Sequence, residues 1–444
     1  MIAVRMLADP LLIARCEEPP SATIQVPGSK SISCRVIVLA AIADGCSALS
    51  GLLRGDDTDS LLAAMETLGV SIEGDGAEMA VRGRHPLVPA QPRVDLGHGG
   101  TPARFMLAVA TLTDGGIAID GSSRLRERPM GDMVDLLSSL GVEVEAMGVA
   151  DHLPLRVVGG PWRINHLEVG ATASSQFLSA LLLVAPLMSG GLTVQLRHRA
   201  TSEPYLKLTI AELQKWGVPV TAEYEDGRLV RITVPSTPLH ARERVIPADS
   251  SSALFWAAAA AIIPGAHLTI PRLGLDDGQP DAAAFKVLQE MGLGIENLEE
   301  GVRLRGPAQL HAIGTIDCDG MPDAAPALAV AACFADGQTR LTGLGTLRHK
   351  ESDRVMTIAG ELGRAGADVA IEGDDLVIRP VPLPDLPVTI QTWDDHRIAM
   401  ALAVLGLRRG GISVSDPGCV AKSYPMFWED LTRLYGEARS GDTA

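Results

Sequence analysis

The chain has 444 residues, more than one hydrophobic core usually supports, so two or more domains are expected. Its formal net charge of -16 argues against binding to nucleic acid or to anionic membranes, because both attract basic proteins. The six cysteines contain no C-x-x-C pair, which fits a reducing compartment and predicts no metal site. The N-terminus lacks the features of a signal peptide, so a cytoplasmic protein is expected.

In chain order, six stretches that are typical of helices each end at a glycine, and most continue into an alternating, strand-like segment. These glycines are Gly69, Gly141, Gly217, Gly292, Gly366 and Gly436. Glycine adopts the left-handed conformation without steric cost, so each is interpreted as a helix C-terminal cap. A repeat of about 70 residues is too long for a thin solenoid and predicts six small α/β subdomains. The sixth is expected to be cut short by the C-terminus.

The first chemical motif is PGSKSISCR, at residues 27–35. A glycine-marked turn precedes a helix that is expected from about Ser31, with Lys30 and Arg35 close by. Backbone N–H groups at such a helix start bind phosphate or carboxylate, and a capped surface helix is the competing interpretation. A nucleotide P-loop is rejected because Ser29, and not glycine, precedes the lysine.

Basic and hydroxyl residues recur at glycine- or proline-marked helix starts along the rest of the chain. The segments are GHGGTPARF (97–105), RLRERPM (124–130), ASSQF (173–177), TSEPY (201–205), LRHKESDR (347–354), WDDHR (393–397) and DPGCVAKSYP (416–425). A charged run is usually a solvated surface, but recurrence in unit after unit favours a shared site. If the units share one geometry, these starts would form a cationic site for a multiply anionic substrate.

Two carboxylates stand out within these segments. Asp323 directly precedes an apolar helix, and Glu351 lies between Lys350 and Arg354. A carboxylate and a lysine in a cationic site are natural partners in proton transfer. Two alternatives stay open, in which Asp323 is a helix N-cap and Glu351 is simply paired with Arg354. His396 has no H-x-x-x-H partner and is a poor metal ligand.

Proline-rich segments mark candidate domain boundaries. Residues 234–253 carry three prolines and a serine cluster, as a linker between the third and fourth units would. If the chain passes from one domain to the other only once, the halves are about 1–240 and 245–444. Prolines near residues 19–27 mark a second place where the chain could pass between domains, and the N-terminal segment would then belong with the C-terminal half. Near the start of the first repeat helix, Asp56, Asp57 and Thr58 are interpreted as a capping cluster.

Together the motifs resemble those of one family, the 5-enolpyruvylshikimate-3-phosphate (EPSP) synthases. The resemblance runs from end to end and includes, in order, PGSKSxxxR, G-x-x-GT-x-x-R, RERPM, SSQF, PDAA, KESDR, DDHR and AK-[ST]-[YF]-P. It implies a two-domain inverse α/β barrel, with three βαβ-type units around a pseudo-threefold axis in each domain. The implied domains are residues 1–24 with 246–444, and residues 25–245, with the active site in the cleft between them.

The resemblance also implies the reaction. The family transfers the enolpyruvyl group of phosphoenolpyruvate to the 5-hydroxyl of shikimate 3-phosphate in the shikimate pathway, which leads to chorismate and the aromatic amino acids. Phosphate is released by addition and elimination. No metal, organic cofactor, nucleic acid or membrane is implied, and a monomer is expected. One alternative is the enolpyruvyl transferase of UDP-N-acetylglucosamine, which is disfavoured because SSRLRERPM lacks its loop cysteine. The other is an inactive relative that acts as a binding protein.

Where the motifs match, the resemblance assigns the family's site residues to positions in this chain. The implied residues for shikimate 3-phosphate are Lys30, Ser31, Arg35, Thr101, Ser174, Ser175, Gln176, Ser202, Tyr205, Asp323 and Lys350. Those for phosphoenolpyruvate are Lys30, Gly100, Arg128, Gln176, Arg354, Arg397 and Lys422. Asp323 is implied as the base near the 5-hydroxyl, and Glu351 and Lys30 as proton carriers at the methylene carbon.

Three positions depart from the residues that are usual in the family. They are His98, Phe105 and Thr346. The changes alter pocket walls and leave the proton-transfer residues intact. Sensitivity to glyphosate, the inhibitor that targets this family, is therefore left open.

Overall fold

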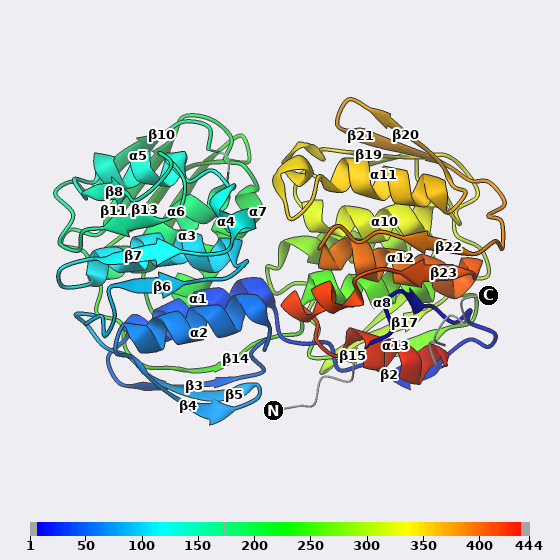
Figure 1. The fold of residues 1–444 in the computed structure, drawn as a ribbon, viewed down its shortest axis with the longest axis horizontal. Helices are drawn as coiled ribbons and strands as arrows, with labels where there is room; N and C mark the ends of the chain where they lie inside the picture. The colour runs from blue at the N-terminus through cyan, green and yellow to red at the C-terminus, as the bar shows by residue number, and fades with distance from the viewer. Residues whose placement is uncertain (1–6, 173, 437–444) are drawn as a thin grey trace. The chain divides into compact units, whose positions relative to one another are not determined.

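The computed structural model describes residues 7–172 and 174–436, and these divide into two units. Unit 1 comprises Met1–Pro27 and Pro247–Ala444, and unit 2 comprises Gly28–Ile246. The chain therefore starts in unit 1, builds unit 2 and returns to unit 1 (Figure 1).

Unit 2 is built from three four-stranded sheets with one shared pattern. Their strand orders are β14-β3-β5-β4, β6-β7-β9-β8 and β10-β11-β13-β12. In each sheet the first pair is parallel and the next two pairs are antiparallel. The strands are β3 (Cys46–Ser50), β4 (Ser71–Asp75), β5 (Glu78–Arg82), β6 (Arg93–Asp95), β7 (Ile117–Asp120), β8 (Val144–Ala146), β9 (Leu155–Val157), β10 (His166–Val169), β11 (Leu192–Leu196), β12 (Thr221–Glu225), β13 (Arg228–Val234) and β14 (Glu243–Val245).

Two sheets of unit 1 have this same four-stranded pattern, and the third sheet has three strands. Its sheets have the orders β16-β17-β15-β2, β18-β19-β21-β20 and β1-β23-β22. The strands are β1 (Leu11–Leu12), β2 (Ser21–Thr23), β15 (His267–Pro271), β16 (Gly294–Leu298), β17 (Gly301–Arg305), β18 (Thr315–Asp317), β19 (Thr339–Thr342), β20 (Asp368–Glu372), β21 (Asp375–Arg379), β22 (Val388–Ile390) and β23 (Ile412–Val414).

Strands from the far end of the sequence complete several of these sheets. The last strand of unit 2, β14, pairs in parallel with its first strand, β3. In unit 1, β2 pairs with β15, and β1 pairs antiparallel with β23. The sixth unit was expected to be cut short by the C-terminus, but β1, from the start of the chain, completes its sheet. The glycine spacing could not predict this pairing because β1 has only two residues.

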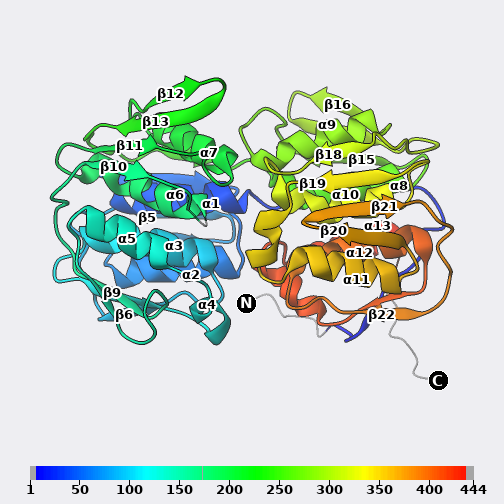
Figure 2. The same cartoon turned by 90° about the horizontal axis from the view of Figure 1, so that it is seen from above.

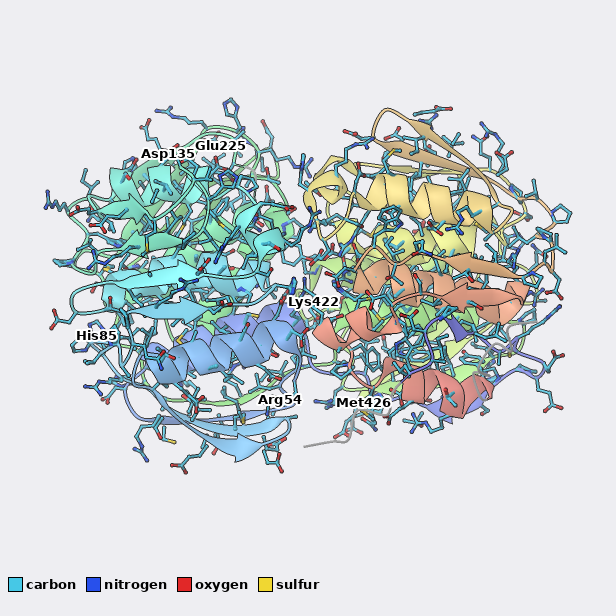
Figure 3. All side chains as sticks on the ribbon, viewed as in Figure 1. Arg54, His85, Asp135, Glu225, Lys422 and Met426 are labelled. Carbon is cyan, nitrogen blue, oxygen red and sulfur yellow. The ribbon has the colours of Figure 1, made fainter. Side chains whose placement is uncertain are left out.

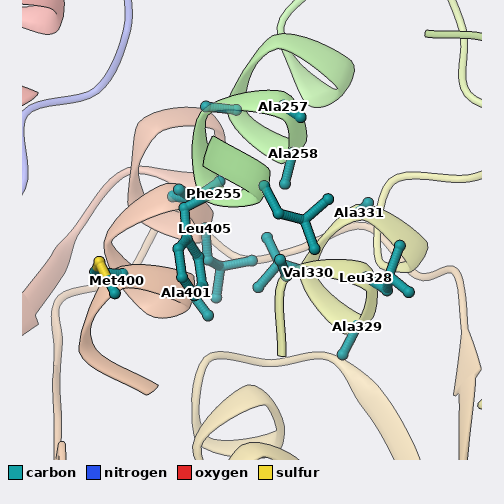
Figure 4. Packing of buried hydrophobic residues seen from close by; sticks show 14 of the residues in the cluster. Phe255, Ala257, Ala258, Leu328, Ala329, Val330, Ala331, Met400, Ala401 and Leu405 are labelled. Carbon is teal, nitrogen blue, oxygen red and sulfur yellow. The ribbon is translucent and has the colours of Figure 1, made fainter. Parts of the chain in front are cut away.

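The helices form two classes that differ in burial. The inner helices α1 (Lys30–Ile42), α3 (Gly100–Val109) and α6 (Ser175–Val184) are buried along almost their whole length and contact one another inside unit 2 (Figure 2). In unit 1 the same is true of α8 (Ser250–Ile262), α10 (Ala325–Ala332) and α12 (His396–Arg409). Helices that are apolar all round are stable only when they are buried. Val330 and Leu405 point toward each other between these helices, with Ala258 above them (Figure 4).

The outer helices have one buried and one exposed face, and they end at the repeated glycines. They are α2 (Asp56–Thr67), α5 (Gly131–Ser139), α7 (Glu203–Lys215), α9 (Ala283–Glu290), α11 (Arg354–Arg364) and α13 (Phe427–Tyr435). All six glycines have positive φ angles, from 81° to 116°, so the predicted caps are confirmed. At Gly217, for example, its own N–H donates to Gln214 O (2.9 Å) and the next N–H donates to Leu213 O (3.0 Å), which is a Schellman motif.

The remaining elements are short. They are the helix α4 (Ser123–Arg126) and the 3-10 turns η1 (Ala110–Leu112), η2 (Ala185–Leu187), η3 (Pro280–Ala282), η4 (Pro322–Ala324), η5 (Gly345–His349) and η6 (Pro417–Lys422). All six cysteines are free thiols. Of the helices in residues 7–172 and 174–436, none has the length and apolarity that a bilayer span requires.

Candidate functional site

The predicted site residues lie at or near the N-terminal ends of helices in both units. Such ends carry unpaired backbone N–H groups and a partial positive charge, which favours bound anions. Inner helices or the turns before them contribute Lys30, Ser31, Arg35, Gly100, Thr101, Ser174, Ser175, Gln176, Asp323 and Arg397. Outer helices or the turns before them contribute Arg128, Ser202, Tyr205, Lys350, Glu351, Arg354 and Lys422. Residue 173, in the ASSQF segment, lies outside the described residues.

In unit 2, Arg35 joins the starts of α1 and α7. Its side chain is buried, and its guanidinium donates to Thr209 Oγ1 (2.8 Å), Ser31 O (2.8 Å) and Tyr205 O (3.0 Å). The ring of Phe105 lies 5.5 Å from the guanidinium carbon. Burial lowers the pKa of Arg35 to about 10. The arginine thus holds Ser31 and Tyr205 close together by contacts within the protein.

Gln176 joins the starts of α3 and α6. Its side-chain amide donates to Thr101 Oγ1 (2.9 Å), and its carbonyl oxygen accepts from Arg104. The Ser174 hydroxyl accepts from the backbone N–H of Gln176 (3.2 Å), so this serine is the N-cap of α6. The Arg104 guanidinium lies over the Phe177 ring at 5.0 Å. The structure therefore brings Thr101, Ser174 and Gln176 together.

Lys30 has a carboxylate partner that the sequence did not predict. Its Nζ lies 3.5 Å from Asp57 Oδ2, and the Asp57 side chain is buried. Asp57 was interpreted as a helix cap, but the cap of α2 uses Thr58, whose hydroxyl accepts from the Gly55 N–H (3.2 Å). The interpretation is right for Thr58 and wrong for Asp57, whose carboxylate faces Lys30.

The arginine-rich segment before α5 lies against the start of α3. A methyl carbon added to Gly100 would lie 2.9 Å from Arg128 Cζ, so glycine is the residue that leaves room for the guanidinium. The same segment is tethered by the buried Asp120, whose two oxygens each accept from Arg126 at 2.8 Å. His98 contacts the Ser122 hydroxyl through Nδ1 (3.2 Å). The remaining predicted residue of unit 2, Ser202, is the N-cap residue of α7 and has a positive φ of 51°.

In unit 1, Arg354 is the centre of the candidate site. Its side chain is 1% exposed and contacts three carboxylates, which are Asp323 (2.7 Å), Glu351 (2.8 Å) and Asp395 (2.8 Å). Burial by itself lowers the pKa of Arg354, but the three carboxylate charges outweigh burial and raise the pKa above its usual value. The guanidinium therefore stays charged inside the protein.

Asp323 is surrounded by cations. Its Oδ1 accepts from Arg354 and lies 3.4 Å from Lys350 Nζ, and its Oδ2 lies 3.1 Å from Arg397 Nη2. No side chain caps η4 or α10, so the helix-cap interpretation of Asp323 is wrong. Burial lowers the pKa of Lys350, and Asp323 opposes that effect. Thr346, one of the unusual residues, lies in η5 of the same unit.

Glu351 links two cations. One oxygen accepts from Arg354, as the pairing interpretation predicted, and the other accepts from Lys422 Nζ at 2.8 Å. Lys422, which is labelled in Figure 3, lies at the end of η6 and is largely buried. A carboxylate and an ammonium in contact at a buried position can pass a proton between them.

Two further buried aspartates belong to this region and were missed. Asp395 is fully buried and caps α12 by accepting from Arg397 N (3.0 Å), and Ser352 Oγ also donates to it (3.0 Å). The signal for it was an aspartate directly before a predicted helix. Asp281 lies in a second Pro-Asp-Ala turn that matches the turn of Asp323 in sequence. Within the described part of the chain, no three His, Cys, Asp or Glu side chains are grouped as metal ligands would be.

The chain is similar to known proteins along almost its whole length. The family model described as EPSP synthase (3-phosphoshikimate 1-carboxyvinyltransferase) matches residues 16–431. Proteins named 3-phosphoshikimate 1-carboxyvinyltransferase from Thiobacillus denitrificans and Syntrophobacter fumaroxidans are 38% and 37% identical, and the alignments cover 93% of this chain and 97% of each relative.

Solved structures show the same fold. The EPSP synthase of Acinetobacter baumannii matches with a TM-score of 0.81 and 28% identity, covering 96% of this chain and 98% of that chain. An enolpyruvyl transferase of Streptomyces tendae matches with a TM-score of 0.73 and 19% identity, covering 96% and 98%, and shows the fold alone.

Proposed function

The chain belongs to the EPSP synthase family, and we propose that it transfers the enolpyruvyl group of phosphoenolpyruvate to the 5-hydroxyl of shikimate 3-phosphate. The observation that carries this proposal is the set of three cations around Asp323, next to the Glu351–Lys422 pair. Both substrates carry phosphate and carboxylate groups, which arginine and lysine bind by charge-assisted hydrogen bonds. The same cluster contains the carboxylates that proton transfer requires.

Unit 1 is proposed to supply the proton-transfer groups and part of the anion clamp. Asp323 would accept the proton of the 5-hydroxyl as its oxygen bonds to the central carbon of phosphoenolpyruvate. Glu351 would deliver a proton to the methylene carbon and remove one from the resulting methyl group as phosphate leaves. Arg354, Arg397 and Lys422 would bind phosphoenolpyruvate, and Lys350 would contact shikimate 3-phosphate.

Unit 2 is proposed to hold the other groups of the same substrates. Ser31, Arg35, Thr101, Ser174, Ser175, Gln176, Ser202 and Tyr205 are assigned to shikimate 3-phosphate. Lys30, Gly100, Arg128 and Gln176 are assigned to phosphoenolpyruvate, and Lys30 is a second proton carrier. The support is that the Arg35 and Gln176 contacts bring these helix starts together within the unit. Neither unit carries the whole motif set, so we propose that both serve one reaction.

Two properties of the working enzyme are also proposed. Six free thiols support a reducing compartment, and we propose the cytoplasm. A monomer is also proposed, as the family resemblance implies. Light scattering on the purified protein checks the monomer.

A phosphate-release assay tests the function. Purified protein is given phosphoenolpyruvate alone, with shikimate 3-phosphate, or with UDP-N-acetylglucosamine. Phosphate release is expected with shikimate 3-phosphate only, and mass spectrometry should find the enolpyruvyl ether. Release with the UDP sugar, or no release with shikimate 3-phosphate from folded protein, would refute the proposal. The Asp323→Asn variant is the matched control for contaminating activity.

A further inference from the structure

The carboxylate of Asp281 is buried without full hydrogen bonding. The residue is 1% exposed, and its Oδ2 accepts from the Ser251 hydroxyl of α8. Its Oδ1 has no hydrogen-bond partner among the residues that the structure describes. Burial of an ionised carboxylate is costly unless its oxygens are satisfied. Packing alone therefore does not explain why an aspartate occupies this position.

The segment around Asp281 is fixed in place. The side chain of the preceding Gln279 accepts from Ser250 N (3.1 Å) and donates to Ala248 O (2.8 Å), which ties the segment to the start of α8. The turn η3 contacts both α8 and η4, the turn that holds Asp323. The carboxylate of Asp281 is thus held at a defined position by its neighbours.

The charges that act on Asp281 come from three separate elements. They are Asp323 in η4, Arg397 in α12 and Asp249 at the N-cap of α8, and the Cys318 thiol is also close enough to feel its charge. Burial, and then the negative charge of Asp323, raise the pKa of Asp281 to about 6. Arg397 opposes this rise, and Asp281 in turn contributes to the raised pKa of Arg397.

We propose that Asp281 is a positioning residue that acts through Asp323 and Arg397. Three cations stabilise the ionised form of Asp323 and would make it a weak base. The charge of Asp281 offsets those cations and attracts the same Arg397 guanidinium that pairs with Asp323. The proposal rests on the proposed function, in which Asp323 accepts the substrate proton.

The pH profile of Asp281→Asn tests this role. The kcat/KM of the free enzyme reports the ionisation of its essential groups. In the wild type, protonation of Asp281 near pH 6 removes the charge that offsets the cations, so kcat/KM is expected to fall several-fold as pH drops through about 6. Asp281→Asn lacks this charge at every pH, so this acidic limb should disappear and the plateau rate should be several-fold lower. Ser251→Ala should move the limb to higher pH, because it removes one hydrogen bond that favours ionised Asp281.

Asp277→Asn is the matched control. Asp277 accepts from Gln279 on the same segment, so its variant disturbs the segment but leaves the charge that faces Arg397. An acidic limb that stays in place in both Asp281→Asn and Ser251→Ala, with folded protein by circular dichroism, would overturn the proposal. Wild-type protein that releases no phosphate would instead refute the proposed function. Infrared titration adds a readout without turnover: a carboxyl band that titrates near pH 6 should be absent from Asp281→Asn, and its persistence would contradict the assignment.

Discussion

Gly100→Ala is expected to act through Arg128. The new methyl carbon would overlap Arg128 Nη1 and lie 2.9 Å from Arg128 Cζ, whereas atoms in contact are separated by about 3.5 Å or more. The guanidinium must therefore retreat by about 1 Å. A misplacement of about 1 Å in a binding group can cost a hundred-fold in rate, and the flexible arginine side chain can recover part of that loss, so a loss of about ten-fold in kcat/KM for phosphoenolpyruvate is expected. Glyphosate is a slightly longer anion, and its inhibition should weaken by more.

Steady-state phosphate release at varied phosphoenolpyruvate gives kcat and KM for the wild type, Gly100→Ala, Arg128→Ala and the double variant. Gly170→Ala is the control, because a methyl group there meets no atom within 4 Å. If the methyl group acts through the guanidinium, the double variant should be no slower than Arg128→Ala alone. Losses of kcat/KM that add up in the double variant would refute this reasoning. The glyphosate prediction would be refuted if Gly100→Ala weakened the binding of glyphosate and of phosphoenolpyruvate equally.

Three more predictions address unit 1. Asp323→Asn keeps the size of the side chain and should lower kcat by about two to four orders of magnitude. Calorimetry should show little change in the binding of shikimate 3-phosphate. Turnover within a few-fold of the wild-type rate would exclude Asp323 as the base. Asp395→Ala leaves the buried Arg354 without one of its carboxylate partners and should lower the free energy of unfolding by roughly 3–5 kcal/mol. Urea titrations measure this loss, and a loss below about 1 kcal/mol would contradict the buried pairing. The pKa of Asp281 is raised from 3.8 to about 6 in the folded protein, so its protonation stabilises the fold fully below pH 3.8, and that stabilisation is lost as pH rises through 6. The difference in unfolding free energy between wild type and Asp281→Asn should therefore change by about 2.5 kcal/mol between pH 4 and pH 8, and parallel curves would disprove the shift.

Local signals predicted the repeating parts of the fold. A glycine that must adopt a positive φ marks the end of each outer helix whatever surrounds it, so Gly69 and its five equivalents were identified from spacing alone. Strands that pair over long sequence distances were not predicted. β1 and β2 have two and three residues, which is too few for an alternating pattern to be visible.

The candidate site also divides into residues that local sequence signals indicate and residues that they do not. Asp323 and Glu351 were singled out because their own segments carry the motif residues. The pairing of Lys30 with Asp57 and that of Arg354 with Asp395 were not predicted, because these residues become neighbours only when separate helix starts are packed together. Asp281 was missed for a related reason, since its burial and the charges that face it come from α8, α12 and η4.

The pairing of β1 with β23 has a consequence for synthesis on the ribosome. The strand at Leu11–Leu12 is made first, and its partner at Ile412–Val414 follows some 400 residues later. At a synthesis rate of about 5–20 residues per second, roughly 20–80 s pass between the synthesis of β1 and that of β23. Unit 2 is continuous in sequence and has all its strands, β14 included, long before then. We therefore expect unit 2 to fold while the chain is still growing, and unit 1 to be completed only as the last residues emerge.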